Sequence, residues 1–416
     1  MNRLKNISII FLLSSFLFSF IISCDSTNPK PPEKPPGYQE DIPWPSLADS
    51  PWPIYRGDPQ NTSRSSYGPI IGNLTWEIDS ITVWSGITID SENNIYFVGQ
   101  SGLYSYDEVG NLRWLLNFSP GTAGDNPTPL LLKEGVIITA SRQEIVGADL
   151  DGNLLWTIPI TFCWSNSFTV SKSGSIYCNV FRNSGSSLLE ITAEGNIIWE
   201  LAPSIFTDFL ENLVFSPDSK TIYGSSVNHE ELIAFDTESK TIKWTYPAKS
   251  RYAPSIDNAG NIYFNSHNKN NNMFVIALNE NGEFLWEQNV GEDNFNIHYY
   301  GVCIDYFGNI YSGYIDEEHP DGAIISFKQD GSVNWIVSTS GLRGRITSDI
   351  KGNIYILRYS GIEEVTIESF SKEGENNWEL SFTYTSASFP APLVINSNSA
   401  LYLAQKYYRA GVKKFN

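Results

Sequence analysis

The sequence predicts an all-β protein: an eight-bladed β-propeller of four-stranded antiparallel blades, closed by an N-terminal strand that completes the C-terminal blade. First, eight of the twelve tryptophans recur at intervals of 38 to 49 residues, near the roughly 40–45 residues of one propeller blade. Second, the phrase GNIY or a variant of it recurs with them. Third, the last repeat lacks an outer strand, which residues 70–79 can supply. The repeated tryptophans are Trp76, Trp114, Trp156, Trp199, Trp244, Trp286, Trp335 and Trp378.

Residues 1–24 have the features of a signal peptide. Arg3 and Lys5 form a positive start, and an uncharged apolar stretch runs from Ile7 to Ile22. That stretch is short for a membrane-spanning helix and suits a signal. It ends in IISC, which resembles a bacterial lipobox, so we expect Cys24 to be lipidated and to become the mature N-terminus. The alternative is an ordinary signal peptide with an incidental cysteine.

Residues 25–50 are predicted to form a Pro-rich tether. Their run NPKPPEKPPG favours an extended chain, because proline lacks the backbone N–H that helices and sheets require. At ~3 Å per residue, such a tether would hold a globular domain tens of Å from a membrane. The leader and tether together predict a lipid-anchored protein of the bacterial cell envelope that faces outside the cytoplasm. Whether the anchor lies in the inner or the outer membrane stays open.

Residues 51–416 are predicted to form a single propeller, with residues 51–69 as its lead-in segment. In the repeat at 253–290, a first strand precedes NIYFNS, and the strands FVIAL and FLWEQNV follow on either side of the turn NENGE. Short strands bounded by Gly, Asn and Asp are typical of hairpins. The second strand carries an aromatic residue that we expect to be buried between blades. These residues are Tyr96, Tyr177, Tyr223, Tyr263, Tyr311, Tyr355 and Tyr402, and Ile137 takes the place in the remaining repeat.

The two ends of the repeat region predict how the ring closes. The last repeat has strands at 392–397, 400–405 and 410–416 but no strand with a tryptophan, whereas residues 70–79 have a turn and a tryptophan strand with no blade before them. We therefore expect Trp76 to lie on the outer strand of the eighth blade, paired with residues 410–416. An open array, or a seven-bladed ring with spare strands, is the alternative.

Charge and cysteine usage exclude several functions. The chain has 27 basic and 46 acidic residues, a net charge of −19, which disfavours nucleic-acid binding. Beyond Cys24 there are Cys163, Cys178 and Cys303. None is adjacent to another and none has the spacing of a metal site. We expect them to be small apolar residues within strands.

Two segments resemble the PQQ-binding-like β-propeller repeat family. The hairpin AFDTESKTIKW at 234–244 is similar to that family's repeat A-x-D-x-x-T-G-x-x-x-W, although Ser239 and Lys240 stand where Thr and Gly are usual. The stretch WPIYRGDPQNTSRSS at 52–66 is similar to the lead-in W-x-x-x-R-G-D-x-x-x-T-G-x-S, with Ser63 in place of Gly. The resemblance covers about residues 52–416 and implies the propeller fold. It also implies a packing role for the RGD motif of the lead-in.

The family contains enzymes and non-enzymes, so the resemblance alone does not decide the function. In its quinoprotein dehydrogenases, the cofactor stacks between a Trp and a disulfide of two adjacent cysteines, beside a Ca²⁺. This chain has no adjacent cysteines. The stretch DLDGN at 149–153 resembles the start of a calcium loop, but the Glu that would complete the loop is missing. We therefore expect no cofactor, no metal site and no catalytic residue.

The prediction is a non-catalytic envelope lipoprotein whose monomeric propeller binds a protein partner, as the resemblance to the lipoprotein scaffold of the outer-membrane β-barrel assembly machine implies. The alternatives are a PQQ- and Ca²⁺-dependent dehydrogenase and a carbohydrate-binding propeller. Contacts are expected at the rim of the central channel, on loops that join successive blades. Aromatic and Arg side chains there suit a binding surface, with packing at the channel mouth as the competing interpretation. The candidates are Trp84, Phe162, Trp164, Phe206, Tyr252, Tyr299, Tyr300 and Arg343.

Overall fold

The computed structural model contains two compact units, Met1–Tyr38 and Gln39–Asn416. Within these, the described residues are 33–69, 73–119, 126–182, 185–201, 213–226, 230–250, 252–270, 272–292, 301–314, 318–319, 321–339, 342–359, 364–383, 391–404 and 411–416. The predicted signal peptide and the lipidation site at Cys24 lie outside them. In the first unit, residues 33–38 form a turn in which the Tyr38 N–H donates to the carbonyl of Pro35 at 3.1 Å. No helix long and apolar enough to cross a membrane occurs in the described segments.

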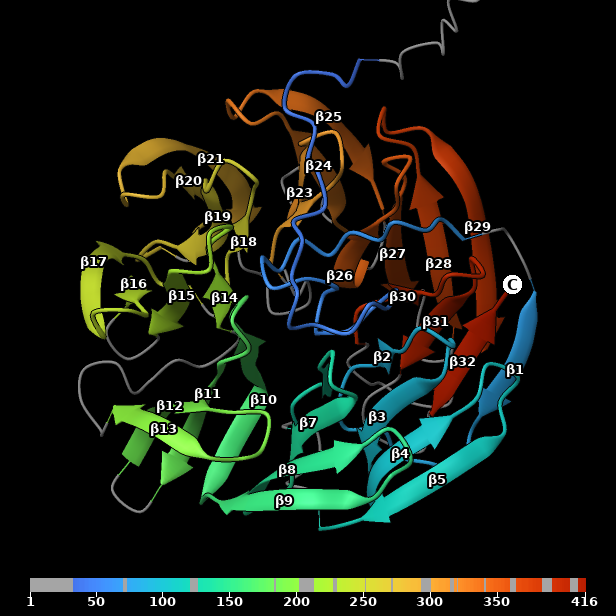
Figure 1. The fold of residues 1–416 in the computed structure, drawn as a ribbon. Coiled ribbons are helices and arrows are strands. Elements are labelled where there is room, and N and C mark those ends of the chain that lie inside the picture. The colour runs from blue at the N-terminus through green and yellow to red at the C-terminus, as the bar shows by residue number, and fades with distance from the viewer. Residues whose placement is uncertain are drawn as a thin grey trace, which may run out of the picture. The chain divides into compact units, whose positions relative to one another are not determined.

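The second unit contains eight four-stranded antiparallel sheets, which form the blades of a propeller (Figure 1). Blade 1 consists of β2 (Thr88–Ile89), β3 (Ile95–Gly99), β4 (Gly102–Tyr106) and β5 (Leu112–Asn117). Blade 2 consists of β6 (Leu130–Leu131), β7 (Val136–Ala140), β8 (Glu144–Asp149) and β9 (Leu154–Pro159). Blade 3 consists of β10 (Phe162–Val170), β11 (Ile176–Arg182), β12 (Gly185–Ile191) and β13 (Ile197–Leu201). Blade 4 consists of β14 (Val214–Phe215), β15 (Thr221–Ser226), β16 (Glu231–Asp236) and β17 (Thr241–Pro247).

The second half of the ring repeats this plan. Blade 5 consists of β18 (Ser255–Ile256), β19 (Ile262–His267), β20 (Asn272–Leu278) and β21 (Phe284–Glu292). Blade 6 consists of β22 (Cys303–Ile304), β23 (Ile310–Tyr314), β24 (Ala323–Phe327) and β25 (Val333–Ser338). Blade 7 consists of β26 (Leu342–Ser348), β27 (Ile354–Tyr359), β28 (Glu364–Phe370) and β29 (Asn376–Thr383). Blade 8 consists of β30 (Val394–Ile395), β31 (Leu401–Ala404), β32 (Val412–Phe415) and β1 (Leu74–Ile78). The predicted all-β, eight-bladed architecture is confirmed.

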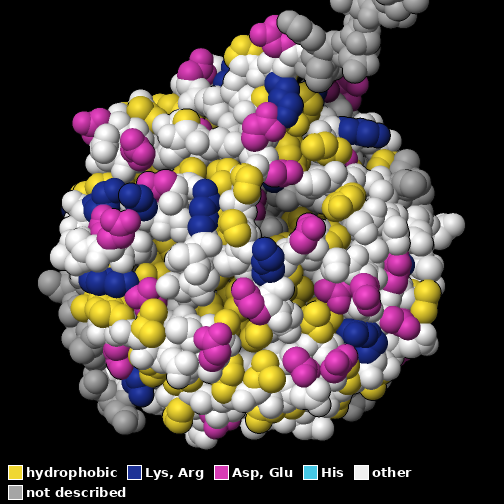
Figure 2. Space-filling model, in the orientation of Figure 1, with side chains coloured by type: hydrophobic (Ala, Val, Ile, Leu, Met, Phe, Trp, Pro, Cys, Tyr) yellow, Lys and Arg dark blue, Asp and Glu magenta, His cyan; other side chains and the backbone are white. Residues whose placement is uncertain are grey.

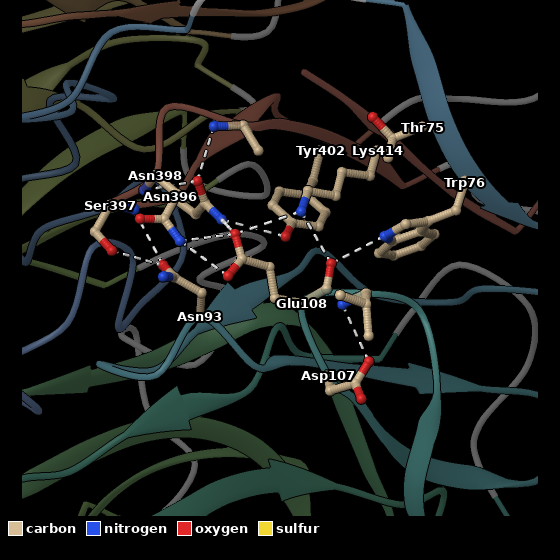
Figure 3. A network of polar contacts seen from close by, with 12 residues as sticks. Thr75, Trp76, Asn93, Asp107, Glu108, Asn396, Ser397, Asn398, Tyr402 and Lys414 are labelled. Atoms are coloured by element: carbon tan, nitrogen blue, oxygen red, sulfur yellow. Dashed lines mark hydrogen bonds and ion pairs between the residues drawn. The ribbon is translucent and has the colours of Figure 1, made fainter.

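The ring closes as the sequence predicts. Strand β1 pairs antiparallel with β32, with Trp76 opposite Lys414 and Ile78 opposite Val412. Figure 3 shows the polar contacts that join this blade to blade 1. The Glu108 carboxylate accepts hydrogen bonds from the Asn398 side-chain amide at 2.9 Å and the Asn396 amide at 3.1 Å, and its backbone carbonyl accepts from Trp76 Nε1 at 3.0 Å. Strand β1 is thus held by its backbone pairing with β32 and by the hydrogen bond from Trp76 to Glu108 of blade 1.

The recurring phrase GNIY belongs to the turn between the first and second strands. In blade 6, Asp305 Oδ1 accepts from the N–H groups of Phe307 and Asn309, and Oδ2 accepts from the Asn309 amide and the Tyr311 hydroxyl, all at 2.8–2.9 Å. Blades 1, 5 and 7 repeat this arrangement around Asp90, Asp257 and Asp349. The phrase recurs because a single buried carboxylate organises the turn and holds the second-strand tyrosine.

Aromatic packing joins each blade to the next, as predicted. The seven repeated tyrosines and Ile137 are at most 2% exposed. In blade 5, Tyr263 and Trp286 have ring centroids 5.9 Å apart, and Trp286 Nε1 donates to the carbonyl of Gln329 in the next blade at 2.8 Å. A Cβ at Gly331 of that neighbouring turn would lie 2.7 Å from the indole. Equivalent indole–carbonyl bonds are made by Trp76, Trp114, Trp156, Trp244 and Trp335.

The propeller has two different faces. The turns between first and second strands and between third and fourth strands lie on one face, which we call the turn face. The connections between second and third strands and between successive blades lie on the other, which we call the loop face. In Figure 1 the lead-in segment, drawn in dark blue, crosses the centre of the ring.

Candidate functional site

The centre of the ring is filled by part of the chain itself. The innermost strand of a propeller blade has one unpaired edge, whose backbone N–H groups need acceptors. Here residues 52–65 wind around the inside of the ring and supply their carbonyls in the order of the blades. Six inner-strand N–H groups are paired in this way, at 2.8–3.0 Å: Ile89 to Trp52, Leu131 to Pro53, Phe215 to Pro59, Ile256 to Gln60, Ile304 to Thr62 and Ser348 to Ser63.

The local sequence explains how this segment turns so tightly. Arg56, Gly57, Asn61 and Ser63 all have positive φ, between 59° and 89°, a region that is unfavourable for residues other than glycine. The Asp58 carboxylate accepts hydrogen bonds from the backbone N–H and the hydroxyl of Thr62, which stabilises the turn that follows. Burial raises the pKa of Asp58, and Arg64 and Thr62 oppose that effect.

Two arginines meet at the end of the channel nearer the loop face. The Arg56 side chain is 1% exposed and donates from Nη2 to the carbonyl of Val302, whereas its Nε and Nη1 have no hydrogen-bond partner. Burial, and then the positive charge of Arg345, lower the pKa of Arg56 to about 10. The Arg345 guanidinium stacks 4.9 Å from the ring of Tyr55 and 5.8 Å from that of Tyr252. Arg56 of the RGD motif is therefore part of the core, and Gly57 and Asp58 are half-buried beside it, in agreement with the expected packing role.

Only part of the predicted partner-binding set can be placed. Trp84 is half-buried, and its backbone N–H donates to the carbonyl of Val98 at 2.8 Å. Phe162 is half-buried, with its ring 6.0 Å from that of Phe181, and Tyr252 is half-buried beside Arg345. Phe206, Tyr299 and Tyr300 lie outside the described residues, as do the side chains of Trp164 and Arg343, which belong to β10 and β26. Of the three that can be placed, Tyr252 lies beside the buried Arg345, and the binding role of the whole set stays a prediction.

The turn-face end of the channel holds a pocket that sequence reasoning missed. Residues 39–48 cross the first turns of several blades: the Gln39 N–H donates to the carbonyl of Tyr306 at 2.8 Å, and Trp44 Nε1 donates to the carbonyl of Val170 at 2.8 Å. The compact unit therefore starts at Gln39, ahead of the boundary predicted at residue 51. A pocket of about 500 Å³ lies between this stretch and residues 57–66. It combines prolines and Trp44 with Asp41, Asp49, Asp58, Arg64 and Lys133.

A polar cluster forms one wall of this pocket. The hydroxyl of Tyr306 donates to Asp41 Oδ1 at 2.8 Å, and that of Ser66 donates to Asp41 Oδ2 at 3.0 Å. The Arg64 guanidinium lies 5.0 Å from the centroid of the Tyr306 ring and donates from Nη2 to the carbonyl of Glu40 at 2.9 Å. Figure 2 shows acidic and basic side chains together around the centre of the ring. No sequence motif joins residue 41 to residue 306, so this cluster has no signature along the chain.

The cysteines have the predicted structural role, and the stretch DLDGN forms a hairpin turn. Cys163, Cys178 and Cys303 are buried in β10, β11 and β22. Burial raises the pKa of the Cys303 thiol to about 12. Asp149 Oδ1 accepts from the N–H groups of Asp151 and Asn153, as in an ordinary hairpin turn. Across the described segments, no three His, Cys, Asp or Glu side chains lie together as a metal site would require.

The comparison with the propeller of Dos1 recovers the fold, and two further solved structures match with lower TM-scores. The propeller of Dos1 matches with a TM-score of 0.59 at 12% identity, covering 84% of this chain and 95% of that one. The β-propeller domain of Cps50 (Swd1) from Myceliophteria thermophila matches with a TM-score of 0.48 at 10% identity, covering 83% and 98%. Hydrazine synthase of Kuenenia stuttgartiensis matches with a TM-score of 0.47 at 12% identity, covering 71% and 93%. No curated protein sequence matches the chain.

The family comparison agrees with the motifs. The family described as outer membrane protein assembly factor BamB matches residues 65–288, which is more than half of the chain. The matched stretch runs from the end of the lead-in segment to the outer strand of blade 5, and it includes the hairpin with Lys240 in place of glycine. The chain belongs to this family of PQQ-like propellers.

Proposed function

We propose that the protein is a lipid-anchored scaffold of the bacterial cell envelope and that its propeller holds a protein partner on the loop face. Three features support this: the lipobox-like IISC before Cys24, a Pro-rich tether, and membership of a family whose description is an outer-membrane assembly factor. In this proposal Cys24 carries the lipid, the chain faces away from the cytoplasm, and the propeller acts as a monomer without catalysis.

The observation that carries the proposal is the filled channel. An enzyme that worked on the propeller axis would need room there for its substrate. Residues 52–65 occupy this space and are hydrogen-bonded to the inner strands of six blades. Besides the turn-face pocket, the surfaces that stay available are the loops at the rim of the loop face, where Trp84 and Tyr252 are half-buried. Tyr252 lies beside Arg345, and aromatic and arginine side chains are enriched in binding hot spots.

Site-specific photocrosslinking in the native envelope tests the proposed face. A photoreactive residue at position 84 or 252 should give a crosslink to one defined protein, and the same residue at the exposed Thr75 on the outer strand or at the exposed Lys220 on the turn face should not. Binding of that purified protein should then weaken about tenfold or more in Trp84→Ala. Crosslinks confined to Lys220 or Thr75 would contradict the proposed face.

The two alternative functions are separated by direct assays. If the purified chain reduces a dye in the presence of PQQ, Ca²⁺ and an alcohol, the scaffold proposal fails in favour of a quinoprotein enzyme. Saturable binding to a glycan array that is lost in Trp84→Ala would favour the carbohydrate-binding alternative.

Lipidation has its own test. Labelling with a radioactive fatty acid should mark the chain, and Cys24→Ala should abolish the label and release the protein from the membrane fraction. A label retained in Cys24→Ala would contradict the assignment of the anchor, while leaving the partner-binding proposal standing.

A further inference from the structure

The turn-face pocket has the dimensions and composition of a ligand site. Its volume of about 500 Å³ falls within the range of roughly 300–1,000 Å³ typical of small-molecule sites. Such sites combine apolar walls with a few polar groups. Here Pro43, Trp44 and Pro59 supply apolar surface, and Arg64 and Lys133 supply positive charge.

Of the three aspartates that line the pocket, Asp49 is exposed, and the other two already accept hydrogen bonds within the protein. Both oxygens of Asp41 accept hydrogen bonds, from Tyr306 and from Ser66. Both oxygens of Asp58 accept hydrogen bonds from Thr62. A ligand that offered only donors would therefore have to displace internal hydrogen bonds at these two carboxylates.

The donors of Arg64, in contrast, are used only in part. Arg64 is 7% exposed, yet its Nε and Nη1 have no hydrogen-bond partner. Asp41 Oδ1 lies 3.8 Å from Nε, beyond hydrogen-bond distance, and Nη2 donates to the carbonyl of Glu40 and, at 3.5 Å, to Asn258 Oδ1. Ser50 Oγ is also buried without a partner. An unpaired buried N–H of a charged group lowers the stability of the protein. A ligand acceptor that forms a hydrogen bond with it therefore gains binding free energy.

We propose that this pocket binds a carboxylate attached to an apolar group, with the carboxylate between Arg64 and Lys133. The Lys133 side chain is exposed and forms no hydrogen bond or ion pair within the described structure. It can therefore approach the second carboxylate oxygen, while Arg64 donates to the first. The apolar group then packs on the prolines and Trp44. Such a ligand is either the carboxyl terminus of a polypeptide or a free small organic acid.

This site is independent of the proposed function. It lies on the turn face, whereas the proposed partner surface lies on the loop face, so each proposal can fail while the other stands.

Calorimetric titration of the full chain in detergent tests the inference with three probes. They are N-acetyl-Ala-Ala-Phe with a free carboxyl terminus, the same peptide as its amide, and hydrocinnamate. We expect the peptide acid to bind about tenfold or more tightly than the amide, because only the acid supplies a charged acceptor. Binding of hydrocinnamate as well assigns the site to small organic acids, and binding of the peptide acid alone assigns it to polypeptide termini.

Variants locate the site. Arg64→Gln should weaken binding of the acid about tenfold or more, and Lys133→Glu should have a similar effect through charge reversal. The exposed Lys220, on the turn of blade 4, provides the matched control Lys220→Gln, which should bind as the wild type does. If Arg64→Gln does not fold, the affinity of Lys133→Glu decides whether the pocket binds the acid, because a substitution of the exposed Lys133 should leave the fold intact. Equal affinity for acid and amide, no binding of either acid, or full affinity in Lys133→Glu overturns the proposal.

Discussion

The first turns of the blades and the lead-in segment differ in how completely their polar groups are hydrogen-bonded. In the first turn of blade 6, Asp305 accepts four hydrogen bonds and is fully buried. In the lead-in, Arg56 and Arg64 are almost as deeply buried, but each has two nitrogens without a partner. Unpaired buried side-chain atoms occur in the repeats as well, for example in Thr88 and Asn265, but those groups are neutral, whereas the unpaired nitrogens of the lead-in belong to charged groups. Such violations are expected where binding rather than stability decides the sequence.

The largest effect is expected from breaking a repeated turn. Asp305→Ala leaves the Tyr311 hydroxyl, the Asn309 amide and two backbone N–H groups without their acceptor, so we expect a loss of about 3–5 kcal/mol of unfolding free energy. Urea denaturation followed by tryptophan fluorescence measures it. The control is Asp107→Ala in an exposed hairpin turn, which should cost about 1 kcal/mol or less. Equal losses of unfolding free energy in Asp305→Ala and Asp107→Ala would contradict the greater importance of the buried turn.

A smaller loss is expected in the lead-in. Gly57 has φ +89°, and a Cβ there would lie 3.1 Å from the carbonyl oxygen of Arg64. Gly57→Ala should therefore cost about 2–3 kcal/mol, through strain and crowding together. Gly174→Ala is the matched control, since φ there is +94° and nothing lies within 4 Å of the added Cβ. Gly174→Ala should lose only the unfolding free energy that backbone strain removes, about 1–2 kcal/mol. If Gly174→Ala loses more than Gly57→Ala does, the lead-in is loosely packed around Gly57.

Replacing the buried Arg56 is expected to change the free energy of unfolding only slightly. Arg56→Met keeps an apolar side chain of similar length but eliminates a buried charge that makes a single hydrogen bond. Replacing buried ionic groups by apolar ones is often neutral or stabilising, so we expect the unfolding free energy to stay the same or to rise by about 1 kcal/mol. Thermal denaturation compares the variant with the wild type. A fall of about 2 kcal/mol or more would mean that Arg56 is fully paired in solution.

The smallest effects concern pH, and they have opposite signs in buried and exposed turns. Burial raises the pKa of Asp305 above its unfolded value, so its contribution to stability grows as pH falls through the folded-state pKa and is lost as pH rises. Hydrogen bonds from Ser239 lower the pKa of the exposed Asp236, so its contribution is present above the unfolded pKa and is lost as pH falls. Carboxyl-carbon NMR titration should show Asp305 above about 3.9 and Asp236 below it. The reverse order would contradict the assigned environments.

The repeats were predictable because they are local and occur many times. The tryptophan spacing, the buried tyrosines and the pairing of Trp76 with residues 410–416 all follow from patterns along the chain. Lys240, which stands where the family repeat has glycine, also has a structural explanation. It takes the left-handed conformation usual for glycine, with φ 59°. Its ammonium pairs with Glu190 and lies 5.0 Å from the ring of Trp199. A long side chain there covers the tryptophan that glycine elsewhere contacts.

The centre of the ring was not predictable in the same way. The carbonyls of Trp52 to Ser63 act as acceptors whatever side chains they carry, so their pairing with the inner strands leaves no motif. The pocket joins Asp41, Arg64 and Tyr306, which are far apart in sequence and meet only when the ring is closed. Of the predicted partner-binding residues, Tyr252 lies beside Arg345, an arginine that the sequence did not single out. This contact depends on side-chain direction, which a pattern along the chain does not give.

The winding of the lead-in has a consequence for how the molecule assembles. Residues 52–65 are synthesised before any blade, and their carbonyls are arranged in the order in which the blades follow. The inner strands of blades 1, 2 and 4 to 7 thus meet an acceptor that is already present as they emerge, so the segment can serve as a template on which the ring forms. Blade 8 is completed after them, because β1 pairs with β32 only once residues 412–415 have been synthesised. We therefore expect the final seam to form last and to be the slowest step of folding.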